Sequence, residues 1–138
     1  MSDFVLDASV ALAWILDEPQ LPYASRVRKR MRAGARALVP PHWHLEIANA
    51  LLTGLRRGRL IPADLDPALQ DIADLTSFID TDDQPDNIAA LAVLGRDRSL
   101  TAYDASYVRL ALRFDLPLAT EDKAMVAAAR AMGISLFT

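Results

Sequence analysis

Four acidic residues are the strongest candidates for chemistry in this sequence. Asp7 directly follows a short apolar segment and Asp122 comes just after another, while Glu46 and Asp104 lie within amphipathic segments. If the two apolar segments are parallel strands, their carboxyl ends share one edge of a sheet, where ligands bind. Two carboxylates about 4 Å apart repel each other by roughly 4 kcal/mol at an effective dielectric of 20. A group of three or four such acids therefore needs a cation.

The residue types also indicate which cation. The chain has no cysteine, which excludes thiolate metal sites, disulfide scaffolds and thiol catalysis. Carboxylate oxygens suit Mg²⁺ or Mn²⁺ better than Zn²⁺. Such an ion lowers the pKa of a bound water, orients a phosphate and stabilises developing negative charge. His42 and His44 are two residues apart at an expected helix start, so they diverge and do not favour a zinc site.

Asp7 and Asp122 also have an interpretation without chemistry. Aspartate is a good N-cap residue, and a helical segment follows Asp7. Thr120 is a credible N-cap for the helix that contains Asp122, and acids in a first turn are stabilised by the helix dipole. Capping and chemistry therefore both remain open for these two residues.

The same ambiguity holds for Asp104 and Glu46. At about 100° per residue, Asp104 falls on the apolar side of its helix, and a lone buried carboxylate is costly unless it is paired, protonated or metal-bound. The alternative is a capping box in which Thr101 is the N-cap and Asp104 its partner. Glu46 lies away from the apolar stripe of its own helix, which is typical of a solvated surface acid, unless that polar face borders a cleft.

Strand and helix patterns alternate along the chain, which predicts a mostly parallel sheet covered by helices on both faces. The length of 138 residues fits one domain, residues 1–138. Five strands are expected, at Phe4–Leu6, Ala37–Val39, Ser77–Ile79, Leu116–Ala119 and Ile134–Phe137. The expected helices are Ala8–Leu16, a segment around Tyr23–Met31, His42–Arg57, Pro62–Leu75, Asp86–Leu94, Ala102–Phe114 and Glu121–Met132.

The charge is strongly polarised along the sequence. The formal net charge is −3, yet residues 19–63 carry nine Lys and Arg side chains and a single acid, Glu46. A basic segment of this size indicates a polyanionic partner, or else a solvated helix face. The longest apolar run, Val10–Leu16, is too short to cross a membrane and follows acids instead of the basic residues of a signal peptide. We therefore expect a cytoplasmic protein without a membrane partner.

Four short motifs resemble, in order and at the right intervals, those of the PIN-domain ribonucleases, and most closely the toxin of VapBC-type toxin–antitoxin pairs. The motifs are Val5-Leu6-Asp7-Ala8-Ser9-Val10-Ala11-Leu12, Leu45-Glu46-Ile47-Ala48-Asn49-Ala50-Leu51, Leu100-Thr101-Ala102-Tyr103-Asp104-Ala105 and Leu118-Ala119-Thr120-Glu121-Asp122. Each motif alone is weak, but four in order are specific. The resemblance implies an α/β fold, a three-layer α/β/α sandwich around the sheet.

The resemblance also implies a metal-dependent endoribonuclease that hydrolyses RNA with Mg²⁺ or Mn²⁺. The catalytic acids would be Asp7, Glu46, Asp104 and Asp122, with Asp7 and Asp104 as the surest metal ligands. Supporting polar residues would be Ser9, Asn49, Thr101 and Thr120. The chain departs from the family pattern at Ala13, where many relatives carry a lysine, which puts a substrate contact from that position in doubt.

Partners follow from the same resemblance. RNA phosphates would be held by Arg28, Lys29, Arg32, Arg56, Arg57 and Arg59. Trp14, Trp43 and Tyr103 would stack on unpaired bases, although core packing explains the two tryptophans equally well. A cognate antitoxin would block the acidic cleft, and the toxin would form a homodimer.

A receiver-type signalling domain is the competing interpretation. That fold also has a doubly wound sheet with acids after its strands, and it needs a phosphoacceptor after the third strand. Asp80, Asp82 and Asp83 stand near that position. However, Asp7 has no adjacent acid, and Asp104 has no role in such a scheme.

Overall fold

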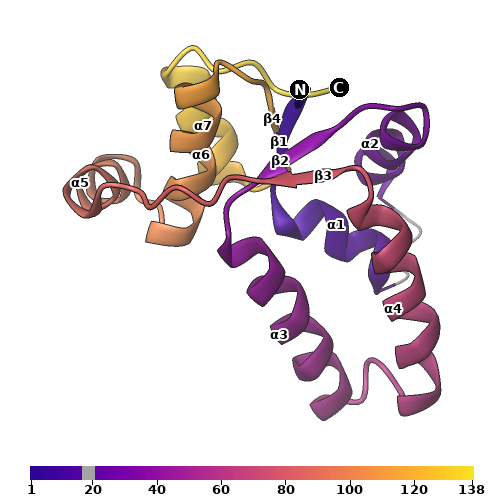
Figure 1. Ribbon diagram of the computed structural model, residues 1–138. Helices are drawn as coiled ribbons and strands as arrows, with labels where there is room; N and C mark the ends of the chain where they lie inside the picture. The colour runs from indigo at the N-terminus through magenta and orange to yellow at the C-terminus, as the bar shows by residue number, and fades with distance from the viewer. Residues whose placement is uncertain (17–20) are drawn as a thin grey trace.

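The computed structural model describes residues 1–16 and 21–138 (Figure 1). Residues 19 and 20, at the start of the basic segment, lie outside this range. The strands are β1 (Phe4–Leu6), β2 (Ala37–Val39), β3 (Ile79–Thr81) and β4 (Leu118–Ala119). The helices are α1 (Ala8–Ile15), α2 (Pro22–Arg32), α3 (His42–Arg56), α4 (Pro62–Thr76), α5 (Ile88–Arg98), α6 (Ala102–Phe114) and α7 (Lys123–Ala131).

The sheet is parallel throughout, with the strand order β3-β2-β1-β4. All three residues of β1 are fully buried, and Val5 is in register with Leu38 on one side and Leu118 on the other. Continuous apolar strands of this kind form where both faces of a parallel sheet are covered. β1 is thus an inner strand, and Asp7 follows it at the inner part of the carboxyl edge.

Helices cover the sheet from two sides (Figure 1). α1 packs against α2, α3 and α4, and α6 packs against β1, β4, α5 and α7. α6 and α7 lie across the sheet from α1 and α2, which gives the expected layers of helix, sheet and helix. Because α3 begins directly after β2 and α6 packs on β1, residues near the start of both helices can approach the carboxyl edge of the sheet.

The prediction of five strands is wrong. In place of a strand at Ile134–Phe137 there is one isolated parallel bridge, between Leu118 and Leu136. The segment is apolar because it covers the core: Ile134 and Phe137 are buried, and the ring of Phe137 stacks on Phe4 with centroids 3.9 Å apart. An apolar alternating pattern therefore marked core packing here and not an extended ladder.

The third strand lies two residues later than predicted. Ser77 is the C-cap of α4, and Phe78 lies in the turn that follows, where its amide donates to the carbonyl of Leu75. The strand instead includes Asp80, whose carboxylate is paired with Arg36 at the sheet edge. α5 also begins later than predicted, at Ile88, because Asn87 caps it through the amide of Ala90.

Among the described residues, no helix is both long and apolar enough to cross a membrane.

Candidate active site at the carboxyl edge of the sheet

Asp7 is the most buried acid at this edge, with 4 % of its surface exposed. Its Oδ2 accepts hydrogen bonds from the hydroxyl of Ser9 at 2.6 Å and from the hydroxyl of Thr120 at 2.9 Å. It also caps α1, because Oδ1 accepts a long hydrogen bond of 3.4 Å from the Ser9 amide. Capping and placement at the site are therefore not alternatives for Asp7, since one carboxylate does both.

Burial decides the electrostatic state of Asp7. Desolvation raises the pKa of its carboxyl above the usual value, and the hydrogen bonds from Ser9 and Thr120 oppose that rise. The negative charge of Asp104 raises the pKa further. Asp7 and Asp104, from opposite ends of the sequence, thus act on each other electrostatically.

Thr120 and Asp122 have roles that differ from the predicted ones. The N-cap of α7 is Asp122, whose Oδ1 accepts from the Met125 amide at 2.9 Å. Thr120 is buried and does not cap the helix; its hydroxyl donates to Asp7 and accepts from the Asp122 amide at 3.1 Å. Through this single hydroxyl, the end of β4 is connected both to Asp7 and to the start of α7.

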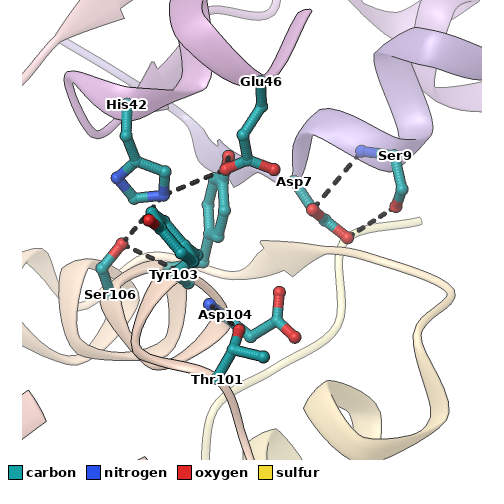
Figure 2. Close-up of polar contacts among 9 residues, drawn as sticks. Asp7, Ser9, His42, Glu46, Thr101, Tyr103, Asp104 and Ser106 are labelled. Carbon is teal, nitrogen blue, oxygen red and sulfur yellow. Dashed lines mark hydrogen bonds and ion pairs between the residues drawn. The ribbon is translucent and has the colours of Figure 1, made fainter. Parts of the chain in front are cut away.

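Asp104 is half-buried near the start of α6 (Figure 2). Thr101 is the N-cap and accepts from the Asp104 amide at 3.1 Å, as the capping interpretation predicted. Desolvation raises the pKa of the Asp104 carboxyl, and the charges of Asp122 and Glu46 raise it further, while Thr101 and His42 lower it. The cap therefore accounts for the hydrogen bond of the Asp104 amide, whereas the Asp104 carboxylate is repelled by Asp122 and Glu46.

Glu46 is not an isolated surface acid. Its Oε1 accepts a hydrogen bond from the buried hydroxyl of Tyr107 at 2.9 Å and lies 3.1 Å from Nε2 of His42, one turn earlier in α3. The hydroxyl of Ser106 is 3.3 Å from the same His42 nitrogen. These contacts join the start of α3 to α6 and fix the position of the Glu46 carboxylate.

His42, Ser106 and Tyr107 contact the site acid Glu46 or each other but were not predicted as site residues. A signal existed for two of them: His42 is four residues before Glu46 and so shares its helix face, and Tyr107 shares the face of Asp104. Neither pattern predicts that these two helix faces pack against each other.

Figure 2 shows the carboxylates of Asp7, Glu46 and Asp104 directed toward a common space from α1, α3 and α6. A cavity of about 770 Å³ opens beside them, and its lining includes Glu46 from α3 and Asp104 from α6. Its other lining residues are His42, Leu45, Ala48, Asn49, Leu52, Thr101 and Tyr103. The predicted supporting residues Asn49 and Thr101 thus lie in this acidic cavity, while Ser9 and Thr120 lie behind Asp7.

As the side chains stand, no three His, Asp or Glu residues of the described chain are grouped closely enough to hold one metal ion together. The assignment of Asp7 and Asp104 as metal ligands stays a prediction, and Glu46 and Asp122 accept hydrogen bonds from the Tyr107 hydroxyl and the Met125 amide. The donor chemistry nevertheless fits a hard divalent cation: the groups are carboxylates, and desolvation together with the charge of neighbouring acids raises the pKa of both Asp7 and Asp104.

The predicted RNA-binding residues do not line the acidic cavity. Arg28 and Arg32 border a cavity between α2 and α4 together with Asp71 and Asp74. Arg56, Arg57 and Arg59 are exposed at the far end of α3, about 15 Å along the helix axis from Glu46 at 1.5 Å per residue. Lys29 is exposed on α2. These basic residues therefore lie on patches away from the acidic cavity.

The three aromatic residues predicted to stack on bases have different surroundings. Trp43 is buried and belongs to the core, and Trp14 donates its indole N–H to the carbonyl of Ala24, so packing explains both. Tyr103 is different, because 63 % of its surface is exposed at the rim of the acidic cavity. Ala13, where many relatives carry a lysine, is buried in α1.

The acids that a receiver domain would use are placed elsewhere. β3 is separated from β1 by β2, so Asp80 and Asp82 do not follow a strand next to that of Asp7. Asp80 pairs with Arg36 and Asp82 with Arg113. This arrangement does not favour the signalling interpretation.

Comparison with known proteins agrees with the geometry. A family model described as PIN domain matches residues 4–131. The fold is similar to the structure described as "Crystal Structure of PAE2754 from Pyrobaculum aerophilum", with a TM-score of 0.69 and 24 % sequence identity over 92 % of this chain and 84 % of that chain. No curated protein matches the sequence. PIN domains are generally nucleases, and because the family model spans nearly all of the described residues, this chain belongs to the PIN domain family.

Proposed function

We propose that this protein is a Mg²⁺- or Mn²⁺-dependent endoribonuclease and that it acts as the toxin of a VapBC-type toxin–antitoxin pair. The proposal rests on the family, on the acids at the carboxyl edge of the sheet and on the order of the four motifs. The catalytic acids are Asp7, Glu46, Asp104 and Asp122.

One observation carries the nuclease proposal. Asp7 is buried, its pKa is raised by desolvation and by Asp104, and two hydroxyls still donate to its Oδ2. A purely structural residue at this position would avoid the cost of a buried charge. Ser9 and Thr120 stabilise the ionised form, which is the form that binds a cation.

Asp7 and Asp104 would hold the cation, with Glu46 and Asp122 beside it. The ion supplies positive charge that lowers the pKa of an attacking water and stabilises the negative charge that develops on the phosphate. Among the described residues, no Lys or Arg lines the acidic cavity, so the chain itself provides little positive charge there.

The remaining steps belong to side chains of the chain. Tyr107 and His42 hold Oε1 of Glu46, which leaves the glutamate positioned to accept a proton from a water molecule. The water oxygen attacks phosphorus in line as the bond from phosphorus to the 3′ oxygen breaks, and the departing 3′ oxygen takes a proton from solvent. Asn49 and Thr101, on two walls of the cavity, are placed to orient the substrate phosphate.

A feature beside the cavity supports the toxin role. Leu45 and Leu52 are exposed large apolar residues on α3, and both line the acidic cavity. An antitoxin segment with apolar anchors at helical spacing would cover this face and close the site. We also propose, from the family resemblance, a homodimer and a cytoplasmic location.

The decisive test is cleavage of a labelled single-stranded RNA with Mg²⁺ or Mn²⁺, with EDTA, and with the Asp7→Asn and Asp104→Asn variants. Cleavage is expected only for the parent protein with metal. Cleavage by a folded Asp7→Asn protein at the parent rate would contradict the site.

The toxin role needs a separate test. Induced expression of the parent protein should arrest bacterial growth, and the Asp104→Asn variant should not. Growth at the normal rate with the parent protein present and able to cleave RNA in vitro would refute the toxin role alone.

A further inference from the structure

A second cavity lies beside the acidic cavity and has no role in the proposed chemistry. Its volume is about 480 Å³, and it lies between the loop after β3, the start of α3 and helices α5 and α6. Its lining includes Pro40, Pro41, Pro85, Leu91 and Leu110, which make its walls largely apolar.

Two residues form a partition between the cavities, because His42 and Tyr103 line both. Their rings meet edge to face with centroids 5.4 Å apart. Nε2 of His42 lies 3.1 Å from Oε1 of Glu46, so the wall of the second cavity touches a site acid directly (Figure 2). Only the side chains of this partition therefore separate a ligand group in the second cavity from Glu46.

The charges in the second cavity are largely compensated. Of its three acids, Asp82 pairs with Arg113 and Asp86 with Arg109, and only Asp83 is without a paired cation among the described residues. The polar groups at the partition are His42 and Ser106, whose hydroxyl is 3.3 Å from Nε2 of His42. Walls of proline and leucine, with most charges paired, suit a nucleobase better than a phosphate.

We infer that the second cavity is a subsite for one unpaired nucleobase of the RNA, next to the phosphate held at the acids. Tyr103, which is 63 % exposed at the boundary, stacks on this base, and His42 and Ser106 lie against its edge. This inference rests on the proposed nuclease function, and it specifies the substrate as single-stranded RNA. A paired base cannot enter, because its faces are stacked and its edge is occupied.

Binding without cleavage tests the subsite directly. The Asp104→Asn background removes cleavage, and the probe is a fluorescent single-stranded RNA of about 12 nucleotides, a length within the range of single-strand sites. Adding Tyr103→Ala should weaken binding about tenfold, as expected for the loss of one base–aromatic stack. Tyr103→Phe keeps the ring and should bind within about twofold of the background protein.

Two further variants separate the subsite from general effects. Ala102→Phe adds a ring at an exposed position that lines the second cavity and not the acidic cavity, and should weaken binding as Tyr103→Ala does. Phe114→Ala removes an exposed aromatic ring from the other end of α6 and should leave binding unchanged. The same RNA annealed to its complement should bind more weakly than the single strand, and Tyr103→Ala should reduce that difference.

The outcomes distinguish the two proposals. If the parent protein cleaves RNA with metal but Tyr103→Ala and Ala102→Phe both bind like the background protein, the subsite is refuted and the nuclease stands. If the variants weaken single-strand binding as expected, the subsite is supported, whether or not the parent protein cleaves this RNA. Equal affinity for single and double strands would also overturn the subsite.

Discussion

The hydroxyl of Tyr107 donates a 2.9 Å hydrogen bond to Oε1 of Glu46, across 61 positions of sequence. Tyr107 is fully buried, and burial together with the charge of Glu46 raises the pKa of its hydroxyl far above the ordinary value. The hydroxyl therefore stays protonated at neutral pH and remains a donor. The helix pattern is typical of a solvent-exposed acid at position 46, but this hydrogen bond fixes the Glu46 carboxylate where α3 meets α6.

Tyr107→Phe should lower the rate of RNA cleavage more than it lowers stability. The change removes one hydrogen bond and leaves no buried polar atom on the ring, so the cost in unfolding free energy is about 1 kcal/mol. Glu46 then loses a donor that positions it, and kcat should fall with little change in KM. Tyr23→Phe is the control, since it removes a hydroxyl bonded to the carbonyl of Phe137. Equal kcat for the two variants would remove Tyr107 from the site.

Asp104→Asn should give a protein that is more stable without metal and inactive with it. The raised pKa means that ionised Asp104 destabilises the fold at neutral pH, and the neutral amide relieves both its desolvation and its repulsion from Asp122 and Glu46. Discounted for its half-exposed position, the gain is about 1 kcal/mol, or roughly 4 °C in Tm.

The pH dependence of this gain has a definite sign. Below the unfolded-state pKa of about 3.9, Asp104 is neutral in both the folded and the unfolded protein, and the stability advantage of the Asn variant vanishes. This advantage grows as the pH rises through the raised folded-state pKa of Asp104. Melting curves from acid to neutral pH measure it. Asp97→Asn, on an exposed pair with Arg96, is the control and should change neither Tm nor cleavage. A less stable Asp104→Asn protein that cleaves at the parent rate would refute the assignment.

Thr120→Val should destabilise the fold by about 1–3 kcal/mol, because the buried Asp7 carboxylate loses a donor and the shape of the side chain is kept. Loss of that donor raises the pKa of Asp7 further, so the loss of stability should be largest at neutral pH and smallest at acid pH. In an Asp7→Asn background the cost should shrink, which a double-mutant cycle by thermal unfolding measures. Additive effects would show that the hydroxyl and the carboxylate do not interact.

Replacing Arg28, Lys29 and Arg32 with Ala tests whether RNA reaches α2. If all three contact phosphates of a single strand, the slope of log affinity against log salt should become shallower by about 2, at a loss per contact of roughly 0.7. The kcat at saturating RNA should be unchanged, since these residues lie outside the acidic cavity. An unchanged salt slope would show that this patch is only solvated, with Arg28 and Arg32 facing Asp71 and Asp74.

Much of the fold and part of the site were predictable from local pattern. Asp7 and Asp122 do come after strands and Asp104 does lie in the first turn of a helix, as the sequence predicted. The partners of these acids were not predictable, because they depend on which faces of distant helices meet. Glu46 shows the limit: its own helix pattern predicted a surface acid, and only the position of α6 brings Tyr107 to it.

The strand errors have a similar origin. Phe137 is apolar because it stacks on Phe4, and Ile79–Thr81 forms a strand despite Asp80 because Arg36 pairs with that acid. Local hydrophobicity reports burial and not hydrogen-bonded pairing. A two- or three-residue strand carries too little pattern to separate the two.

The placement of β1 inside the sheet also sets when the protein can become active during its synthesis. β1 is made first, but its two neighbours are β2 and β4, and the bond between Thr120 and Asp7 spans 113 positions of sequence. Until residues 118–122 have left the ribosome, one side of β1 has no partner, Asp7 lacks one of its two hydroxyl donors, and Asp122 is absent. A growing chain therefore carries no assembled site until residues 118–122 are free to pair with β1.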